Sequence, residues 1–172
     1  MTIVVIGGTP ASGKTSLTHL LAAADTRGVH IETDRFFRFL AHRLDPSLPT
    51  AQQQNTTVIR AYVAAAIEYS AAGYSVYLEG VIGPWALLTV TALAANIQYV
   101  LLHAPLDVVL ARSQTRAMQP SATAAVVTHM HQQFAKVVDE FRRHVIDTEY
   151  KTVEQVADEF FSRSATGAFQ IG

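Results

Sequence analysis

The 172-residue sequence contains no cysteine. This absence excludes disulfide bridges, zinc sites built on thiolates and catalytic cysteines, and it is typical of cytoplasmic proteins. An excess of charge of one sign is also lacking, since 13 Lys and Arg stand against 14 Asp and Glu. With a formal net charge of −1, we expect no broad attraction to nucleic acid or to an anionic membrane surface.

Long hydrophobic runs are missing as well. The N-terminal apolar stretch is short, ends at Gly7 and follows no basic leader, so we expect no secretory signal. The most apolar later stretch, residues 86–104, is interrupted by Asn96 and Gln98 and is typical of a helix end followed by a buried strand, not of a membrane span. The length suits one domain over residues 1–172, which we expect to be a monomer or a homodimer.

Hydrophobic patterning predicts strands that alternate with helices. Short apolar runs indicate buried strands at residues 3–6, 29–33, 75–78, 98–102 and 145–146. Helical patterns separate them at residues 14–24, 53–72, 105–117 and 122–143, and a last helix begins at Thr152, whose spacing to Gln155 matches a capping box. The alternation predicts an α/β fold with a mainly parallel sheet. We expect the tail from residue 164 to be frayed.

The most specific motif is GTPASGKT at residues 8–15, which matches G-x-x-x-x-G-K-[ST] between a predicted strand and a predicted helix. Its glycines allow successive backbone N–H groups to converge on an anion, and the helix directs its positive end at the same point. Lys14 can reach the β- and γ-phosphates of a nucleoside triphosphate, and the Thr15 hydroxyl can ligate Mg²⁺. The alternative, a strand-to-helix turn without a ligand, is disfavoured by this context. The predicted nucleotide-binding residues are Gly8, Thr9, Pro10, Ala11, Ser12, Gly13, Lys14, Thr15 and Ser16.

Acidic residues follow two predicted strands, at the edge where parallel sheets bind ligands. Asp34, after the second strand, could orient a substrate hydroxyl or accept its proton, and Glu32 could hold a water on Mg²⁺. Glu79 ends the third strand in a Walker B-like arrangement and would help to organise the metal. The alternatives are that Thr33 or Asp34 only caps a helix beginning at Arg35 and that Glu79 is an ordinary strand-end acid.

Two arginines follow the fourth strand on one predicted helix. Arg112 and Arg116 are four residues apart and share a face, so they could stabilise charge on a transferred γ-phosphate. The alternative is that the two arginines are favoured near the helix C-terminus by the helix dipole alone. After the last strand, Asp147 and Thr148 lie where a purine base could contact the chain, although turns commonly contain both residue types.

The order of these motifs resembles the small P-loop kinases, in particular the group of chloramphenicol phosphotransferase, gluconate-kinase-like proteins and zeta-toxin-like kinases. The matching segments span almost the whole chain: GGTPASGKTS, ETD, YLEG, RSQTR and HVIDT. The resemblance implies a three-layer P-loop NTPase fold, an α/β fold with a five-stranded parallel sheet of order 2-3-1-4-5 and helices on both faces. It also implies Mg²⁺-dependent transfer of the γ-phosphate of ATP to a small molecule.

The resemblance further implies roles for single residues. Asp34 is similar to the substrate-hydroxyl base of chloramphenicol phosphotransferase, and Glu32 stands where shikimate kinases have an aspartate one methylene shorter. Arg112 and Arg116 are similar to lid arginines, and Asp147 with Thr148 belongs to the adenine-side loop. Residues 117–135 contain no further arginine, which disfavours a nucleoside-monophosphate kinase.

We therefore expect an ATP-dependent small-molecule kinase whose acceptor is a sugar acid, an antibiotic or a nucleotide sugar. A second hypothesis is a nucleotide-binding switch without an acceptor. The sequence lacks an N-K-x-D guanine signature, which disfavours this hypothesis. A nucleic-acid end kinase is a third, disfavoured by the near-neutral charge and the lack of a basic stripe.

Overall fold

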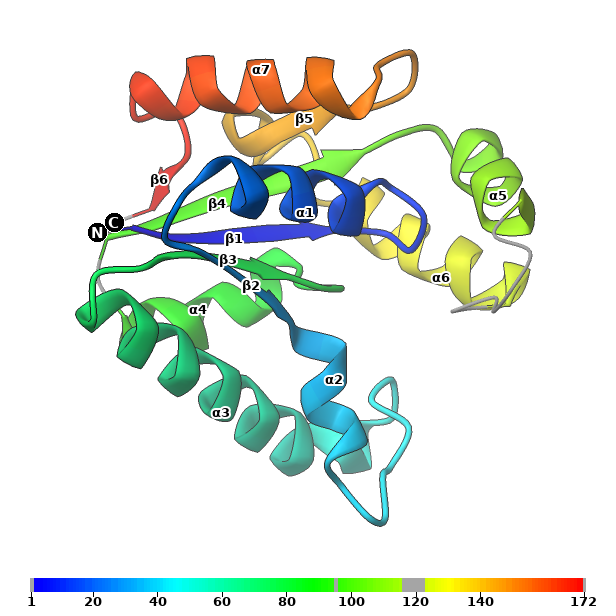
Figure 1. The fold of residues 1–172 in the computed structure, drawn as a ribbon. Helices are drawn as coiled ribbons and strands as arrows, with labels where there is room; N and C mark the ends of the chain where they lie inside the picture. The colour runs from blue at the N-terminus through cyan, green and yellow to red at the C-terminus, as the bar shows by residue number, and fades with distance from the viewer. Residues whose placement is uncertain (1, 95, 116–122, 172) are drawn as a thin grey trace.

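A six-stranded sheet forms the centre of the molecule (Figure 1). The computed structural model describes residues 2–94, 96–115 and 123–171. Five parallel strands have the order β2-β3-β1-β4-β5, which confirms the predicted sheet, and a sixth strand pairs antiparallel with β4. The strands are β1 (Ile3–Gly8), β2 (Gly28–Glu32), β3 (Ser75–Glu79), β4 (Ile97–His103), β5 (Val145–Asp147) and β6 (Gln170–Ile171).

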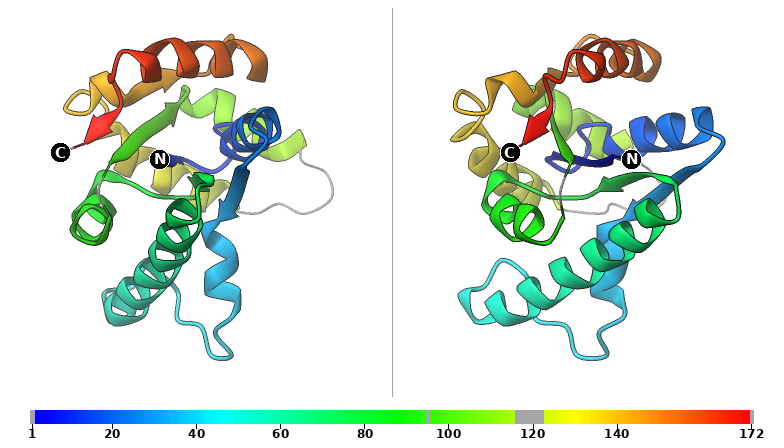
Figure 2. Two further views of the ribbon diagram at one scale, coloured as in Figure 1. Left: turned by 60° about the vertical axis from the view of Figure 1, so that its left-hand side comes forward. Right: turned by 90° about the vertical axis from the view of Figure 1, so that its left-hand side faces the viewer.

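Helices cover both faces of this sheet (Figures 1 and 2). One face carries α1 (Lys14–Ala24) and α7 (Val153–Ala165), and the other carries α3 (Gln52–Ala71) and α4 (Pro84–Leu93). The remaining helical elements are α2 (Thr33–Arg38), η1 (Pro49–Ala51), α5 (Leu106–Thr115), α6 (Ala124–Ala135) and η2 (Arg142–His144). Within the described ranges, none of the helices has the length and apolar character needed to cross a membrane.

The apolar run of β1 follows from this layering. All six residues of the strand are buried. Ile3 and Val5 pack in the cluster under α3 and α4, whereas Val4 and Ile6 pack in the cluster under α1 and α7. A parallel strand covered on both faces has no polar side, so its sequence is continuously hydrophobic.

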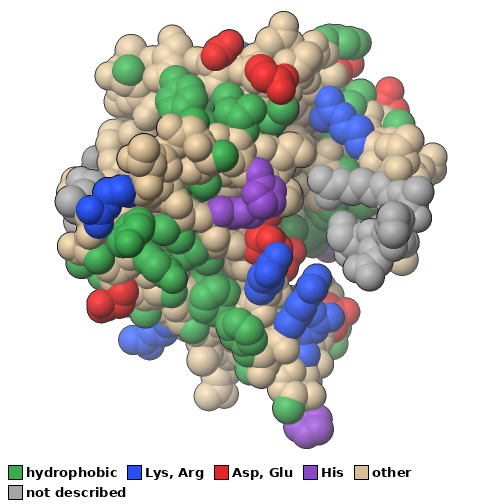
Figure 3. All heavy atoms as spheres, in the orientation of Figure 1, with side chains coloured by type: hydrophobic (Ala, Val, Ile, Leu, Met, Phe, Trp, Pro, Cys, Tyr) green, Lys and Arg blue, Asp and Glu red, His purple; other side chains and the backbone are tan. Residues whose placement is uncertain are grey.

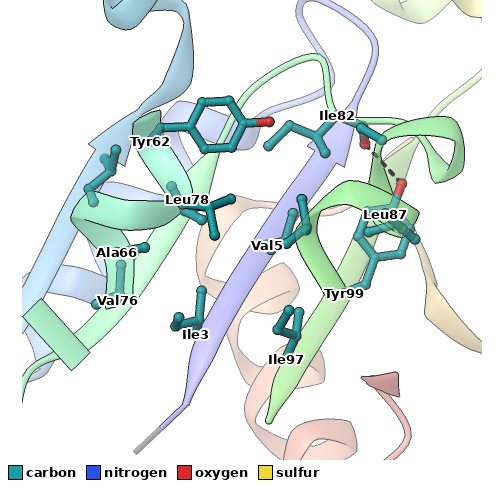
Figure 4. Packing of buried hydrophobic residues seen from close by; sticks show 14 of the residues in the cluster. Ile3, Val5, Tyr62, Ala66, Val76, Leu78, Ile82, Leu87, Ile97 and Tyr99 are labelled. Carbon is teal, nitrogen blue, oxygen red and sulfur yellow. Dashed lines mark hydrogen bonds between the residues drawn. The ribbon is translucent and has the colours of Figure 1, made fainter. Parts of the chain in front are cut away.

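A buried hydrogen bond fixes the loop after β3 (Figure 4). The Tyr99 hydroxyl donates to the Ile82 carbonyl at 2.9 Å. Gly7 lies against the same carbonyl, and a Cβ atom there would stand only 2.1 Å from the oxygen of Ile82. The close approach of these two backbone segments therefore requires glycine at position 7.

The predicted helix over residues 122–143 is wrong in its length. Helix α6 ends at Ala135, and turns lead from there to η2. The turns bring Phe141 edge-on to Tyr99, with ring centroids 6.3 Å apart, and place His144 where its Nδ1 lies 3.0 Å from the Tyr99 carbonyl. Because these contacts are with a distant strand, they override the local helical pattern.

Contrary to expectation, the tail is not frayed over its described residues 164–171. Phe169 is fully buried and stacks on Phe160, with ring centroids 5.8 Å apart. Its carbonyl accepts a hydrogen bond of 2.8 Å from the Tyr99 amide, and β6 follows directly. One aromatic side chain thus anchors a segment that otherwise lacks an apolar run.

The predicted capping box at the start of α7 is confirmed. The Thr152 hydroxyl accepts a bond from the Gln155 amide, and the Gln155 side chain accepts one from the Thr152 amide. We expect Thr152→Ala to lower the free energy of unfolding by about 1 kcal/mol, since a helix amide loses its acceptor. Urea unfolding measures this change, with Thr152→Ser as the control that retains the cap. An unchanged midpoint in Thr152→Ala would contradict the assignment.

Candidate functional site

The loop between β1 and α1 has the backbone of an anion-binding turn. Ala11 and Gly13 have positive φ angles of 65° and 99°. Gly13 occupies the N-cap of α1, where no side chain caps the helix and no acidic residue stands in the first turn. The positive end of α1 is therefore left for an anion from outside the chain. A Cβ atom at Gly13 would meet no atom of the described residues within 4 Å, which leaves room for a ligand at this point of the loop.

Polar side chains line the same loop. Lys14 is only 8% exposed, and its Nζ donates to the Thr9 carbonyl at 2.7 Å. The hydroxyls of Thr9 and Ser12 are buried and have no hydrogen-bond partner among the described residues. Buried hydroxyls without a partner are uncommon in proteins. Together with the uncapped helix end, they fit a loop that is completed by the phosphates of a nucleotide.

Thr15 and Glu79 form the second part of the site. The Thr15 hydroxyl donates to Glu79 Oε1 at 2.8 Å, and His30 Nε2 lies 3.5 Å from the same oxygen, too long for a well-formed hydrogen bond. Burial alone would raise the pKa of Glu79, but the interactions with His30, Thr15 and Lys14 outweigh burial and hold the pKa below its usual value. An ionised carboxylate beside a hydroxyl is a donor set that suits Mg²⁺ and its bound waters.

Asp34 stands in the first turn of α2, near Glu79 and the loop. Although the side chain is exposed, the protein around it partly desolvates the carboxylate, which raises the pKa of Asp34. Attraction to Lys14 opposes this rise, and the negative charge of Glu79 adds to it. The capping alternative is wrong, because the Thr33 hydroxyl donates to the Glu79 carbonyl at 3.1 Å and no side chain caps α2. Among the described residues, no hydrogen bond or ion pair of the Asp34 carboxylate explains its place.

Glu32 is held differently from Glu79. Arg35 donates two hydrogen bonds to its carboxylate, at 2.9 and 2.7 Å. The hydrogen bonds from Arg35 are the main reason that the pKa of Glu32 lies below its usual value. The role of Glu32 in holding a water on Mg²⁺ stays a prediction.

A cavity of about 320 Å³ lies on the other side of the phosphate loop. Its apolar wall contains Leu17, Leu102 and Val156, and its polar rim contains Arg112 and Lys151. Apolar walls with a few polar groups suit a flat heterocycle whose faces are apolar and whose edges are polar. The cavity adjoins the phosphate loop, so one ligand can occupy both.

Thr148 ties three segments together beside this cavity. Its hydroxyl lies 3.2 Å from both the Ser12 and the His103 carbonyls, and its single proton serves one of them at a time. Arg112 donates to the Thr148 hydroxyl at 3.1 Å and to the Thr148 and Glu149 carbonyls at 2.6 and 3.1 Å. Arg112 is thus bonded to the loop after β5, and its predicted action on the γ-phosphate stays a prediction.

Two further predicted site residues are Asp147 and Arg116. Asp147 ends β5, is exposed and accepts a hydrogen bond from the Glu149 amide at 2.9 Å. Among the described residues, its neighbour Thr148 lines the cavity and Asp147 does not. Arg116 lies outside the described residues. The adenine-side role of Asp147 also stays a prediction.

From the sequence we assign no role to His30 or Lys151, which the structure places at the site. The signal for His30 is its position two residues before Glu32 on one strand, because alternate residues of a strand share a face. The sequence carries no comparable signal for Lys151, since its place on the cavity rim depends on how the loop after β5 packs.

A family model described as an AAA domain (AAA_33) matches residues 3–140. The chain belongs to this AAA domain family. The match spans both the phosphate loop and the Asp34 and Glu79 positions, and it confirms the resemblance to small P-loop kinases. No curated protein matches the chain.

Solved structures share the fold of this AAA domain protein. A sugar kinase from Janibacter sp. HTCC2649 has a TM-score of 0.69 at 18% identity, covering 99% of this chain and 98% of that chain. A gluconokinase from Sinorhizobium meliloti 1021 has a TM-score of 0.67 at 16% identity, covering 97% and 93%. The thymidylate kinase of Candida albicans has a TM-score of 0.68 at 12% identity, covering 99% and 94%. These likenesses confirm the P-loop kinase fold.

Proposed function

We propose that this AAA domain protein is a Mg²⁺-dependent phosphotransferase that moves the γ-phosphate of ATP to a hydroxyl of a small molecule. One observation carries the proposal: Lys14, the Thr15–Glu79 pair and Asp34 meet at the edge of the sheet where β1, β2 and β3 end. A phosphate-binding group, a metal-binding group and a free carboxylate are the three parts that phosphoryl transfer to a hydroxyl requires.

Each part has a distinct task in this proposal. The phosphate loop and Lys14 bind and orient the phosphates, while the cavity beside Thr148 accepts the base. Thr15 and the ionised Glu79 would hold Mg²⁺, which neutralises charge on the phosphates when bound. Asp34 accepts the proton of the acceptor hydroxyl as its oxygen bonds to the γ-phosphorus and the bond to ADP breaks.

The acceptor side of the site is polar and aromatic. Arg38 ends α2, the short helix that contains Asp34, and the 77% exposed Phe39 follows directly. Phe36 packs between Phe39 and Tyr62. A cation and an aromatic surface near the carboxylate suit a modestly polar molecule with hydroxyl groups. A sugar acid, an antibiotic or a nucleotide sugar meets this description, and the sugar kinase and gluconokinase with the same fold support the first of these.

The proposal is tested with γ-labelled ATP, Mg²⁺ and a panel of acceptors. The panel contains sugar acids, shikimate, aminoglycosides, chloramphenicol, nucleosides, nucleotide sugars and short oligonucleotides. We expect label on one small-molecule class and none with Lys14→Ala. Release of free phosphate without label on any acceptor would favour the nucleotide switch, and label on oligonucleotides alone would favour an end kinase.

The hydrogen bonds of Thr148 predict an effect on nucleotide affinity. Thr148→Val keeps the shape of the side chain but removes the hydroxyl that contacts Arg112 and the Ser12 carbonyl. Because this hydroxyl joins Arg112 to the phosphate loop in the free protein, its loss should loosen one wall of the cavity, and we expect ATP to bind about tenfold more weakly, roughly 1.4 kcal/mol. Calorimetric titration measures the affinity, and Thr148→Ser is the matched control that should bind like the wild type. Equal affinity in Thr148→Val would show that this loop does not shape the base cavity.

A further inference from the structure

Two histidines and a glutamate converge beside the phosphate site. His19 of α1 and His30 and Glu32 of β2 each offer one ligand atom, and these atoms all lie within 4.8 Å of one another. His30 and Glu32 point to the same face of β2 because they are two residues apart. Helix α1 packs against β2 and brings the His19 ring to the His30 ring, with centroids 4.5 Å apart. Figure 3 shows histidine and acidic side chains side by side near the middle of this face.

We propose that His19, His30 and Glu32 form a binding site for a divalent transition metal ion, with zinc as the first candidate. Imidazole nitrogens and a carboxylate oxygen are ligands that zinc takes in proteins, and they distinguish this His–Glu site from the hydroxyl and carboxylate oxygens offered to Mg²⁺ by Thr15 and Glu79. Three protein ligands leave one position of a tetrahedral ion open to water or another molecule.

The distances are compatible with an ion after small side-chain movements. Ligand atoms bound at about 2.0–2.2 Å around a tetrahedral zinc ion stand roughly 3.3–3.6 Å from one another. The ligand atoms must therefore draw together from separations of up to 4.8 Å. Because the His19 side chain is exposed and Glu32 is partly exposed, both can change rotamer without moving the backbone.

The environment of His30 gives independent support. Its side chain is 11% exposed, and its Nε2 atom is buried without a hydrogen-bond partner among the described residues. The nearest carboxylate oxygen, Oε1 of Glu79, lies 3.5 Å away. A metal ion bound to Nε2 would supply the partner that this buried atom lacks.

The ion pair between Glu32 and Arg35 must break before Glu32 can bind the metal ion. Glu32 is paired with Arg35, whose side chain is 66% exposed. Exposed ion pairs are weak, because both groups are well solvated when they separate. The carboxylate of Glu32 is therefore available to an ion that offers a stronger bond.

The test is zinc binding to the full chain after chelator treatment, without nucleotide or Mg²⁺. Zn²⁺ is titrated in competition with a chromophoric chelator, and Co²⁺ is added separately to record the visible absorption of a four-coordinate site. We expect one Zn²⁺ per chain and an affinity at least roughly tenfold lower in His19→Ala and in Glu32→Gln. The matched control is His129→Ala, which removes an exposed histidine from α6 and should bind Zn²⁺ like the wild type.

Three results would overturn the proposal. They are no uptake of Zn²⁺, wild-type affinity in His19→Ala, and equal losses in His19→Ala and His129→Ala. Zinc held instead by His103 and His131, whose ring centroids are 5.3 Å apart, would leave the affinity of His19→Ala unchanged and so belongs to the second result. Because the readout is binding and not phosphoryl transfer, failure here is independent of the proposed kinase activity.

Discussion

Lys14→Ala is expected to lower phosphoryl transfer by roughly a thousandfold or more, the upper range for removing one preorganised group that stabilises transition-state charge. The Lys14 ammonium is buried in the loop and held by the Thr9 carbonyl at 2.7 Å, so it is positioned before the nucleotide arrives. A fixed charge in a site shielded from water stabilises the developing negative charge without further reorganisation. Transfer of label from γ-labelled ATP to the acceptor measures the effect.

The control for this prediction is Lys136→Ala, which removes an exposed lysine just after α6. It should retain wild-type activity. A thermal unfolding curve for Lys14→Ala shows whether the fold is kept, because the removed side chain is buried. A folded Lys14→Ala protein with activity near the wild type would contradict the assignment of this loop as the phosphate site.

Asp34→Asn is expected to lower transfer by roughly a hundredfold or more while ATP binds almost as before. The amide keeps the size of the side chain but cannot accept the proton of the acceptor hydroxyl. Within the described part of the chain, the Asp34 carboxylate makes no hydrogen bond that the substitution would remove, since the hydroxyl of Thr33, not Asp34, contacts the Glu79 carbonyl at the start of α2. The loss should therefore appear in kcat and not in the affinity for ATP.

The pH dependence gives Asp34 a second signature. A general base acts only when it is deprotonated, so activity should fall as the pH falls through the pKa of Asp34. Since desolvation raises this pKa, the fall should occur at a higher pH than for an ordinary aspartate. The acid limb should be absent from the residual activity of Asp34→Asn. Asp139→Asn, at an exposed aspartate, is the control and should keep both the rate and the limb. Full activity of Asp34→Asn with the true acceptor would show that another group takes the proton.

Features encoded within a short stretch of sequence were predictable. The order of the five parallel strands and the start of α1 at Lys14 follow from apolar runs, a glycine-rich turn and the family resemblance. The proximity of Thr15 to Glu79 was also predictable, because β1 and β3 are adjacent and end at the same edge of the sheet. In these cases local propensity and the tertiary fold favour the same outcome.

Features that depend on distant contacts were not predictable. Helix α6 ends early because Phe141 and His144 pack on Tyr99 of β4, more than 40 residues before them in the sequence. The hydrogen bonds of Arg112 to the loop after β5 likewise join segments that no short pattern relates. The approach of His19 to His30 depends on how α1 crosses β2, which single-sequence periodicity does not specify.

The anchored tail also bears on how this protein avoids aggregation. Strand β5 has three residues and pairs with β4 only from Leu101 to His103. Strand β6 pairs with Ile97 and Gln98 at the other end of β4. Between these two segments, the Phe169 carbonyl accepts a hydrogen bond from the Tyr99 amide. The outer edge of β4 is thus occupied along its length. A bare apolar edge is a template on which a strand of another chain can add, so the segment around β6 shields β4 from edge-to-edge assembly of chains.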